Sequence, residues 1–156
     1  EVDIREFLEK RIEHKKGEVV DTDGKVIGEH DGVWFFTVGQ RHGFKVSIYF
    51  GHPLYVIKKV VGKNQLVVGK KEDCFVREFL VKDFHVIDDS YLPLKSHLLV
   101  RIRHLGELHK ATIESKESDF YRVVLENPVF GVADGQSCVL YDGEVTVGGG
   151  VIETLQ

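Results

Sequence analysis

The alternation of apolar and polar residues predicts a chain built mainly from β-strands, so the expected fold class is all-β. After Gly17, apolar residues recur at every second position or gather in short runs bounded by glycine, asparagine or aspartate, which is typical of strands joined by tight turns. The strands expected in the first half lie at 18–20, 25–27, 33–38, 54–61 and 65–68, with an extended segment at 74–86. Those expected in the second half lie at 98–104, 109–114, 120–125, 137–141 and 144–153.

One short helix and two domains are also expected. Between residues 3 and 12, apolar side chains recur at helical spacing behind Asp3, which can cap the first turn. The polar segment 88–93 ends in a proline and interrupts the strand pattern, as linkers do. We therefore predict a small central β domain at 1–90, with the helix at 3–12 at its start, and a β-barrel or sandwich at 91–156. Short strands at a spacing of roughly 8 to 12 residues suit both architectures.

The composition predicts a folded, cytoplasmic chain. Of the 156 residues, 42% are hydrophobic, which is enough for packed cores. No apolar run approaches the roughly 20 residues that span a bilayer, so no membrane association is expected. Cys74 and Cys138 lie outside any Cys-x-x-Cys motif, which favours two buried thiols over a disulfide or a zinc site. The chain has no methionine, and its first residues, Glu-Val-Asp-Ile-Arg-Glu-Phe-Leu, read as the middle of a longer sequence. We therefore expect it to be a piece of a longer polypeptide.

Charge is distributed unevenly along the chain. The whole sequence has 21 basic and 25 acidic residues, yet the segment 32–71 contains no aspartate or glutamate. Its cations are Arg41, Lys45, Lys58, Lys59, Lys63, Lys70 and Lys71. A segment of this kind in an acidic protein favours an anionic partner such as RNA.

Two pairs of side chains suit such a partner. Gln40 and Arg41 follow a predicted buried strand, and an amide beside a guanidinium suits a phosphate or a base edge. The alternative is that both side chains fix their own loop. Arg101 and Arg103 are two residues apart on a predicted strand, so they share one face at about 7 Å, close to the spacing of successive phosphates on a single strand. The alternative for this pair is an ordinary solvated strand face.

Two further motifs favour structure over chemistry. His30 lies between two carboxylates, but neighbouring residues on a strand point to opposite faces, so a structural histidine is favoured over a metal site. The glycines at 148–150 lie in an apolar strand with no following helix, which favours a bulge or a close strand crossing over a phosphate loop. Because no nucleotide-binding or nucleophile motif is present, we expect no catalytic residue, cofactor or metal in this chain.

A set of motifs in a fixed order extends along nearly the whole chain. The motifs are Gly28-Glu-His-Asp-Gly32, Phe36-Thr-Val-Gly-Gln-Arg-His-Gly43, Pro53-Leu-Tyr-Val-Ile57, Asn64-x-Leu-Val-Val-Gly69, Arg101-Ile-Arg103, Asp134-Gly-Gln136, and Tyr141-Asp-Gly143 followed by Gly148-Gly-Gly-Val-Ile152. This ordered combination resembles the central and carboxy-terminal domains of the tRNA-specific 2-thiouridylases. The resemblance implies that the second domain is a six-stranded type of β-barrel similar to domain 2 of elongation factor Tu.

The resemblance implies a transferase activity whose machinery lies outside this chain. A 2-thiouridylase adenylates the 2-carbonyl oxygen of the wobble uridine in tRNA and then introduces sulfur, which a donor protein supplies as a persulfide. ATP and magnesium bind in an amino-terminal domain that the resemblance does not cover. The first catalytic cysteine lies in that domain as well, and the second precedes the segment that matches residues 3–8. The chain alone is therefore expected to be inactive.

The resemblance also implies where tRNA binds. The family's Arg-Tyr-Arg contact falls on Arg101, Ile102 and Arg103, and its Pro-Gly-Gln contact falls on Asp134, Gly135 and Gln136. Ile102 thus replaces a tyrosine and Asp134 a proline, while residues 44–48 replace a Leu-Gly-Ile-Gly-Gly segment. The expected partner is the anticodon stem-loop region of tRNA.

Two other functions stay open at this point. A module that docks proteins, such as a sulfur carrier or a second copy of the chain, is favoured by the net charge of −3 beyond residue 90, where 6 basic residues oppose 9 acidic ones. A free-standing barrel related to translation factors is the third hypothesis.

Overall fold

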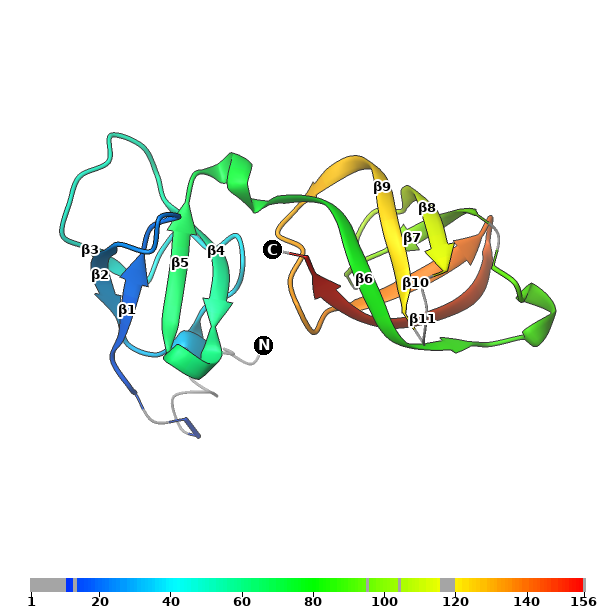
Figure 1. Ribbon diagram of the computed structural model, residues 1–156, viewed down its shortest axis with the longest axis horizontal. Coiled ribbons are helices and arrows are strands. Elements are labelled where there is room, and N and C mark those ends of the chain that lie inside the picture. Colours follow the sequence, from blue (N-terminus) through cyan, green and yellow to red (C-terminus); the bar gives the residue numbers. More distant parts are fainter. Residues whose placement is uncertain (1–10, 13, 95, 104, 116–119, 156) are drawn as a thin grey trace. The chain divides into compact units, whose positions relative to one another are not determined.

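The chain forms two compact units, residues 1–74 and 75–156. The structure is a computed structural model that describes residues 11–12, 14–94, 96–103, 105–115 and 120–155 (Figure 1). The helix predicted at 3–12 therefore lies almost wholly outside the described residues. The all-β class is confirmed, because both units are built from strands joined by turns and short 3-10 helices.

The first unit is a five-stranded sheet in the order β3-β2-β1-β5-β4 (Figure 1). Its strands are β1 (Gly17–Val20), β2 (Val26–His30), β3 (Lys45–Val46), β4 (Tyr55–Val60) and β5 (Gln65–Gly69). The pair β1 and β5 is parallel, whereas the other pairs are antiparallel. The described residues of this unit also form the 3-10 helices η1 (Val33–Phe35), η2 (Val61–Lys63) and η3 (Lys71–Cys74).

The prediction of a strand at 33–38 is wrong, because this segment begins with the 3-10 helix η1. Its Phe35 amide donates to the Gly32 carbonyl at 3.2 Å, and Gly32 has a φ of 142° that an L side chain rarely adopts. The helix turns Val33 into the core while Trp34 stays 52% exposed. An unbroken apolar run does not distinguish a strand from a helical turn, which explains the error.

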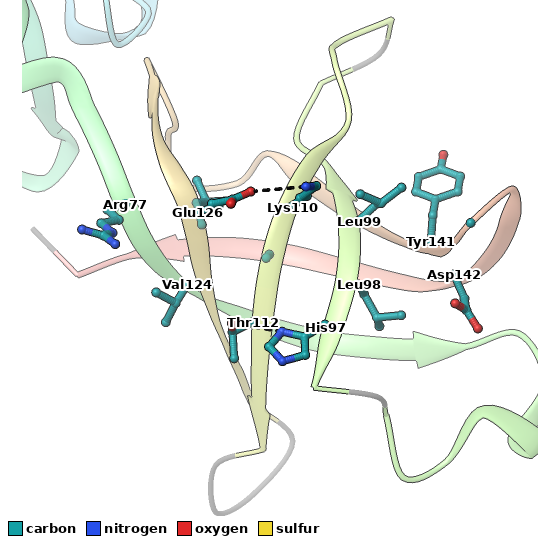
Figure 2. Close-up of a pocket in the computed structure, with 13 residues that line it drawn as sticks. Arg77, His97, Leu98, Leu99, Lys110, Thr112, Val124, Glu126, Tyr141 and Asp142 are labelled. Carbon is teal, nitrogen blue, oxygen red and sulfur yellow. Dashed lines mark hydrogen bonds and ion pairs between the residues drawn. The ribbon is translucent and has the colours of Figure 1, made fainter.

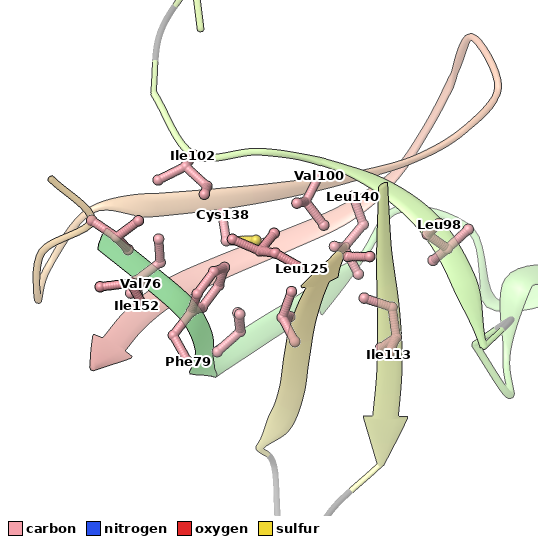
Figure 3. Close-up of a cluster of buried hydrophobic side chains, with 14 of the residues drawn as sticks. Val76, Phe79, Leu98, Val100, Ile102, Ile113, Leu125, Cys138, Leu140 and Ile152 are labelled. Carbon is pink, nitrogen blue, oxygen red and sulfur yellow. The ribbon is translucent and has the colours of Figure 1, made fainter. Parts of the chain in front are cut away.

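The second unit is a closed antiparallel barrel in the order β10-β11-β6-β9-β8-β7 (Figure 1). Its strands are β6 (Phe75–Val86), β7 (His97–Arg101), β8 (His109–Ser115), β9 (Tyr121–Phe130), β10 (Ser137–Asp142) and β11 (Val145–Thr154), with η4 (Asp89–Tyr91) between β6 and β7. Figure 3 shows the core, in which Phe79, Leu125, Leu140 and Ile152 point inward from different strands. Of the two predicted architectures, the barrel is therefore the one formed.

The boundary between the units lies one strand earlier than the predicted position near residue 90. β6 pairs with both β9 and β11, so it belongs to the barrel wall, and the polar segment 88–93 connects two barrel strands. The phenylalanines of β6 fit no simple period because the β6–β9 register shifts between Val76 and Glu78, and Asp83 has a φ of 50°. Despite these two irregularities, the extended segment predicted at 74–86 forms one strand of the barrel, β6.

The glycines of β11 mark a close strand crossing, as predicted. The β11–β6 register shifts between Gly149 and Val151. A Cβ on Gly150 would lie 2.5 Å from the Lys82 carbonyl oxygen, and one on Gly149 would lie 2.8 Å from the Cys138 carbonyl oxygen. Neighbouring backbones therefore leave no room for side chains here.

His30 is a buried structural histidine. Its Nδ1 accepts a hydrogen bond from the Gly32 amide at 3.0 Å, so Nε2 carries the proton and lies 3.2 Å from the Asn64 carbonyl oxygen. Protonation of Nδ1 would remove the bond from Gly32. Burial lowers the pKa of His30 below its ordinary value of 6.5, although the Asn64 carbonyl and Asp31 favour the charged form.

The stability of the first unit is expected to fall as the pH drops below 6.5. The unfolded chain binds a proton at His30 at a higher pH than the folded chain does, so this contribution is complete above 6.5 and is lost as the pH falls toward the folded-state pKa. Urea unfolding followed by Trp34 fluorescence at several pH values measures the effect. In the control His30→Gln, which cannot titrate, the pH dependence should be smaller, and an equal dependence in both proteins would contradict the assignment.

Candidate nucleic-acid interface

Arg101 ends strand β7 and lies against the aromatic ring of Tyr141 on the adjacent strand β10. The two strands pair in a register that sets Arg101 opposite Val139 and Leu99 opposite Tyr141. The guanidinium carbon lies 5.2 Å from the ring centroid, and Nη1 lies 3.5 Å from the tyrosine hydroxyl. A cation over an aromatic face is attracted by the ring quadrupole, so Tyr141 holds Arg101 in one orientation.

This arrangement leaves one buried N–H donor of Arg101 without a hydrogen-bond partner among the described residues. The donor is the Nε–H group of the side chain. A buried donor without a partner costs free energy, so this arginine is held at some cost to the stability of the barrel.

Arg103 follows the end of β7 and fixes a neighbouring loop. Its Nη2 donates to the carbonyl oxygens of Phe130 and of Gly131, the latter at 2.8 Å, where β9 leads toward β10. The residue as a whole stays exposed. Backbone carbonyls thus hold one edge of the Arg103 guanidinium, and no carboxylate among the described residues forms an ion pair with it.

Ile102 lies in the barrel core and is only 3% exposed, although it also borders the hollow that the two arginines line, so its assignment as a tRNA contact stays a prediction. The alternation of side chains along an extended chain turns Ile102 toward the core, where Figure 3 shows it, while Arg101 stays half-buried and Arg103 exposed. Its role is to pack the barrel under the two arginines.

Arg101, Arg103 and Gln136 line one hollow of about 530 Å³ on the outside of the barrel, together with Ile102, Leu105, Ser137, Val139 and Tyr141. Gln136 uses its Oε1 to accept a hydrogen bond from the Ala133 amide at 3.0 Å, which closes the turn before β10. None of the described residues that line this hollow is acidic. The hollow therefore combines two guanidinium groups with an amide in a setting suited to an anion.

Gln40 and Arg41 lie in the first unit. Both ends of the Gln40 amide are used within its loop, since Oε1 accepts from the Thr37 amide at 3.1 Å and Nε2 donates to the His42 carbonyl at 2.7 Å. Arg41 is exposed, and its Nε lies 3.2 Å from Nε2 of His42. Gln40 thus fixes the loop, as its alternative interpretation expects, while the Arg41 side chain faces solvent.

The cations of segment 32–71 do not form one patch. Lys63 precedes β5, whereas Lys70 and Lys71 follow it, so the strand separates them by about 20 Å. Lys59 is half-buried on β4, and burial lowers the pKa of its ammonium group. The segment therefore supplies separate groups of cations at different parts of the sheet.

A second hollow, of about 480 Å³, lies on the outer face of β7, β8 and β9 (Figure 2). Lys110 forms an ion pair with Glu126 at 3.9 Å across its floor, and Tyr141 with Leu99 lies at one end. Acidic and basic groups are mixed here, so this surface does not select for an anion. Tyr141 borders both hollows, and its place beside Arg101 could not be predicted because the pairing of β7 with β10 is not visible in the sequence.

Neither cysteine is suited to nucleophilic chemistry. Cys74 and Cys138 are free and buried. Burial raises the pKa of Cys138 to about 12, so the reactive thiolate is suppressed. Burial also raises the pKa of Cys74, with nearby Asp73 and Glu72 adding to the effect.

The described part of the chain contains neither a metal-binding cluster nor a membrane-spanning helix. No group of three or more histidine, cysteine, aspartate or glutamate side chains suited to a metal occurs among those residues. No helix among them is long and apolar enough to cross a membrane.

Comparison with known families defines the class of the chain in two parts. Residues 5–70 match the family model described as tRNA methyl transferase PRC-barrel domain, and residues 76–152 match the aminomethyltransferase beta-barrel domain. These limits agree with the structural division between Cys74 and Phe75. The first unit is therefore similar to a PRC-barrel domain, and the second is similar to the aminomethyltransferase β-barrel.

Individual relatives narrow the class to a family. The tRNA-specific 2-thiouridylase of Acaryochloris marina is 36% identical over 154 residues, which are 96% of this chain and 43% of the relative. The enzyme of the same name from Clostridioides difficile is 36% identical over 150 residues, or 96% of this chain and 40% of the relative. The chain belongs to the family of the tRNA-specific 2-thiouridylases and spans about two fifths of the length of these relatives.

Proposed function

We propose that this chain is the tRNA-binding portion of a cytoplasmic tRNA-specific 2-thiouridylase. The complete enzyme adenylates and then thiolates C2 of the wobble uridine, using ATP and magnesium in a further domain and a persulfide from a donor protein. The two units of this chain hold the anticodon stem-loop region and perform no chemistry. The observation that carries the proposal is the hollow that joins Arg101, Arg103 and Gln136 without an acidic neighbour among its described lining residues.

We call the hollow lined by Arg101, Arg103 and Gln136 the barrel hollow. Its two arginine side chains are held in place before a ligand binds. Tyr141 orients Arg101, and the carbonyls of Phe130 and Gly131 orient Arg103, so little side-chain entropy is lost when a phosphate binds. Guanidinium groups suit phosphate oxygens because their parallel N–H groups form charge-assisted hydrogen bonds. Such contacts position a nucleic acid without reading its sequence.

The affinity of the chain for tRNA is expected to fall linearly with salt on a double-logarithmic plot. Each neutralised phosphate contributes a slope of about −0.7 on a single strand and about −0.9 on a duplex, so two arginines should give a slope of at least about −1.4. Fluorescence anisotropy of labelled tRNA between about 50 and about 200 mM potassium chloride measures the slope. Binding that is absent, or that does not depend on salt, would defeat the proposal.

Docking of the sulfur-donor protein is the second candidate function. The net charge of −3 beyond residue 90 and the mixed charges around Lys110 and Glu126 favour a protein surface over RNA. This function predicts that the two arginines of the barrel hollow can be replaced without loss of tRNA affinity.

A further inference from the structure

A basic hollow of about 630 Å³ lies at one end of the sheet of the first unit, and we call it the Trp34 hollow. It is lined by Trp34 and by the cations Arg11, Lys15, Lys16 and Lys63. The acidic residue among its lining residues is Glu18, which accepts a hydrogen bond from Gln65 at 3.0 Å. Lys16 is paired with Glu29 at 3.1 Å, so Lys15 and Lys63 are the lysines best suited to an external anion.

Asn64 holds the backbone around this hollow in place. Its Nδ2 donates to the carbonyls of Lys15 and Lys16, both at 2.9 Å, and its Oδ1 accepts from the Val33 amide at 3.1 Å. Its own backbone is left-handed, with a φ of 49°, which asparagine tolerates better than most residues. The segments that carry Lys15, Lys63 and Trp34 therefore meet at one side chain, and their backbones are fixed before a ligand binds.

Trp34 presents its indole at this hollow as a consequence of the fold. The 3-10 helix η1 turns Val33 into the core and leaves Trp34 52% exposed. An exposed indole costs free energy in water and offers a flat stacking surface. Cations beside an aromatic platform are the combination with which proteins bind single-stranded nucleic acids, because the cations hold the phosphates and the ring stacks a base.

We propose that the Trp34 hollow is a second RNA-binding site, in which Lys15 and Lys63 hold the phosphodiester backbone and Trp34 stacks one unpaired base. The base must be unpaired because a base inside a duplex already stacks on its neighbours. This site rests on the proposed tRNA-binding function and adds a contact in the first unit to that of the barrel hollow. An acidic protein segment would use the cations but would have no base to stack on the indole.

The test uses Trp34 itself, since it is the only tryptophan of the sequence. The 156-residue chain is titrated with an unstructured oligouridylate, and Trp34 fluorescence and affinity are recorded at several salt concentrations. We expect the oligonucleotide to quench Trp34. Trp34→Ala should weaken binding about ten-fold, and Trp34→Phe, which retains a stacking ring, should recover part of that loss. The double variant Lys15→Ala and Lys63→Ala should reduce the salt slope by about 1.4.

The double variant Lys70→Ala and Lys71→Ala is the matched control. It removes the same charge from the same sheet at the opposite end of β5, and it should leave the quenching intact. If this control lost as much RNA affinity as the Lys15 and Lys63 variant, the proposal would be overturned, because the RNA would then be held by non-specific electrostatic attraction. Absence of quenching, or equal quenching by polyglutamate that competes with the RNA, would overturn it as well. If substitution of Arg101 and Arg103 abolishes tRNA binding while the Lys15 and Lys63 variant binds normally, the proposed function stands and the Trp34 hollow is refuted.

Discussion

Replacement of both Arg101 and Arg103 by glutamate is expected to lower the affinity for tRNA by at least about 100-fold. A hydrogen bond to a charged group contributes about 1.5 to 3 kcal/mol, and each 1.4 kcal/mol is tenfold in affinity, so two lost contacts account for this factor before any repulsion is counted. The carboxylates would also face the phosphates across a hollow that has no acidic group among its described lining residues. Anisotropy titration with labelled tRNA at low salt measures the loss.

The control for this prediction is Arg77→Glu. Arg77 is exposed on β6, which lies three strands from β7 around the barrel, so the reversal alters the net charge without altering the barrel hollow. Because Arg103 also bonds to the carbonyls of Phe130 and Gly131, the far-ultraviolet circular dichroism of the double variant must match that of the parent. A folded double variant with undiminished tRNA affinity would rule out the barrel hollow and favour the docking of a protein.

The strands that could be predicted are those in which one face alone is buried. In β10, Cys138 and Leu140 point inward between exposed or half-buried neighbours, and in β7 the inward residues are Leu98 and Val100. This alternation is present in the sequence, and turn residues bound each strand. The segment 33–38 has no alternation, so its 3-10 helix could not be separated from a strand.

For each candidate site, the sequence indicated residues that are neighbours along the chain. It did not indicate the residues from distant parts of the chain that contact them. The spacing of Arg101 and Arg103 already placed both side chains on one face of the predicted strand. Tyr141 lies 40 residues from the arginine that it orients, and Asn64 lies 49 residues from Lys15. Such contacts depend on which strands pair and in what register, and one sequence without relatives does not reveal that.

The substitution Phe79→Ala is expected to lower the free energy of unfolding of the barrel by about 3 to 5 kcal/mol. Phe79 is 0% exposed and lies in the core between β6 and its neighbours, so the loss combines a transfer term with the cost of the cavity that the ring leaves behind (Figure 3). Because a domain of ordinary size is stable by about 5 to 15 kcal/mol, this one side chain supports a large share of the total.

The matched control is Phe75→Ala on the same strand. Phe75 is 42% exposed and has an edge contact with Phe130 at 5.5 Å between ring centroids, so its loss should cost about 1 kcal/mol. Urea unfolding followed by far-ultraviolet circular dichroism compares the two variants. The barrel hollow lies on the outside of the wall that Phe79 supports, so tRNA binding by Phe79→Ala should decline only with the unfolded fraction. Equal destabilisation by the two substitutions would show that the barrel is not held together by this core.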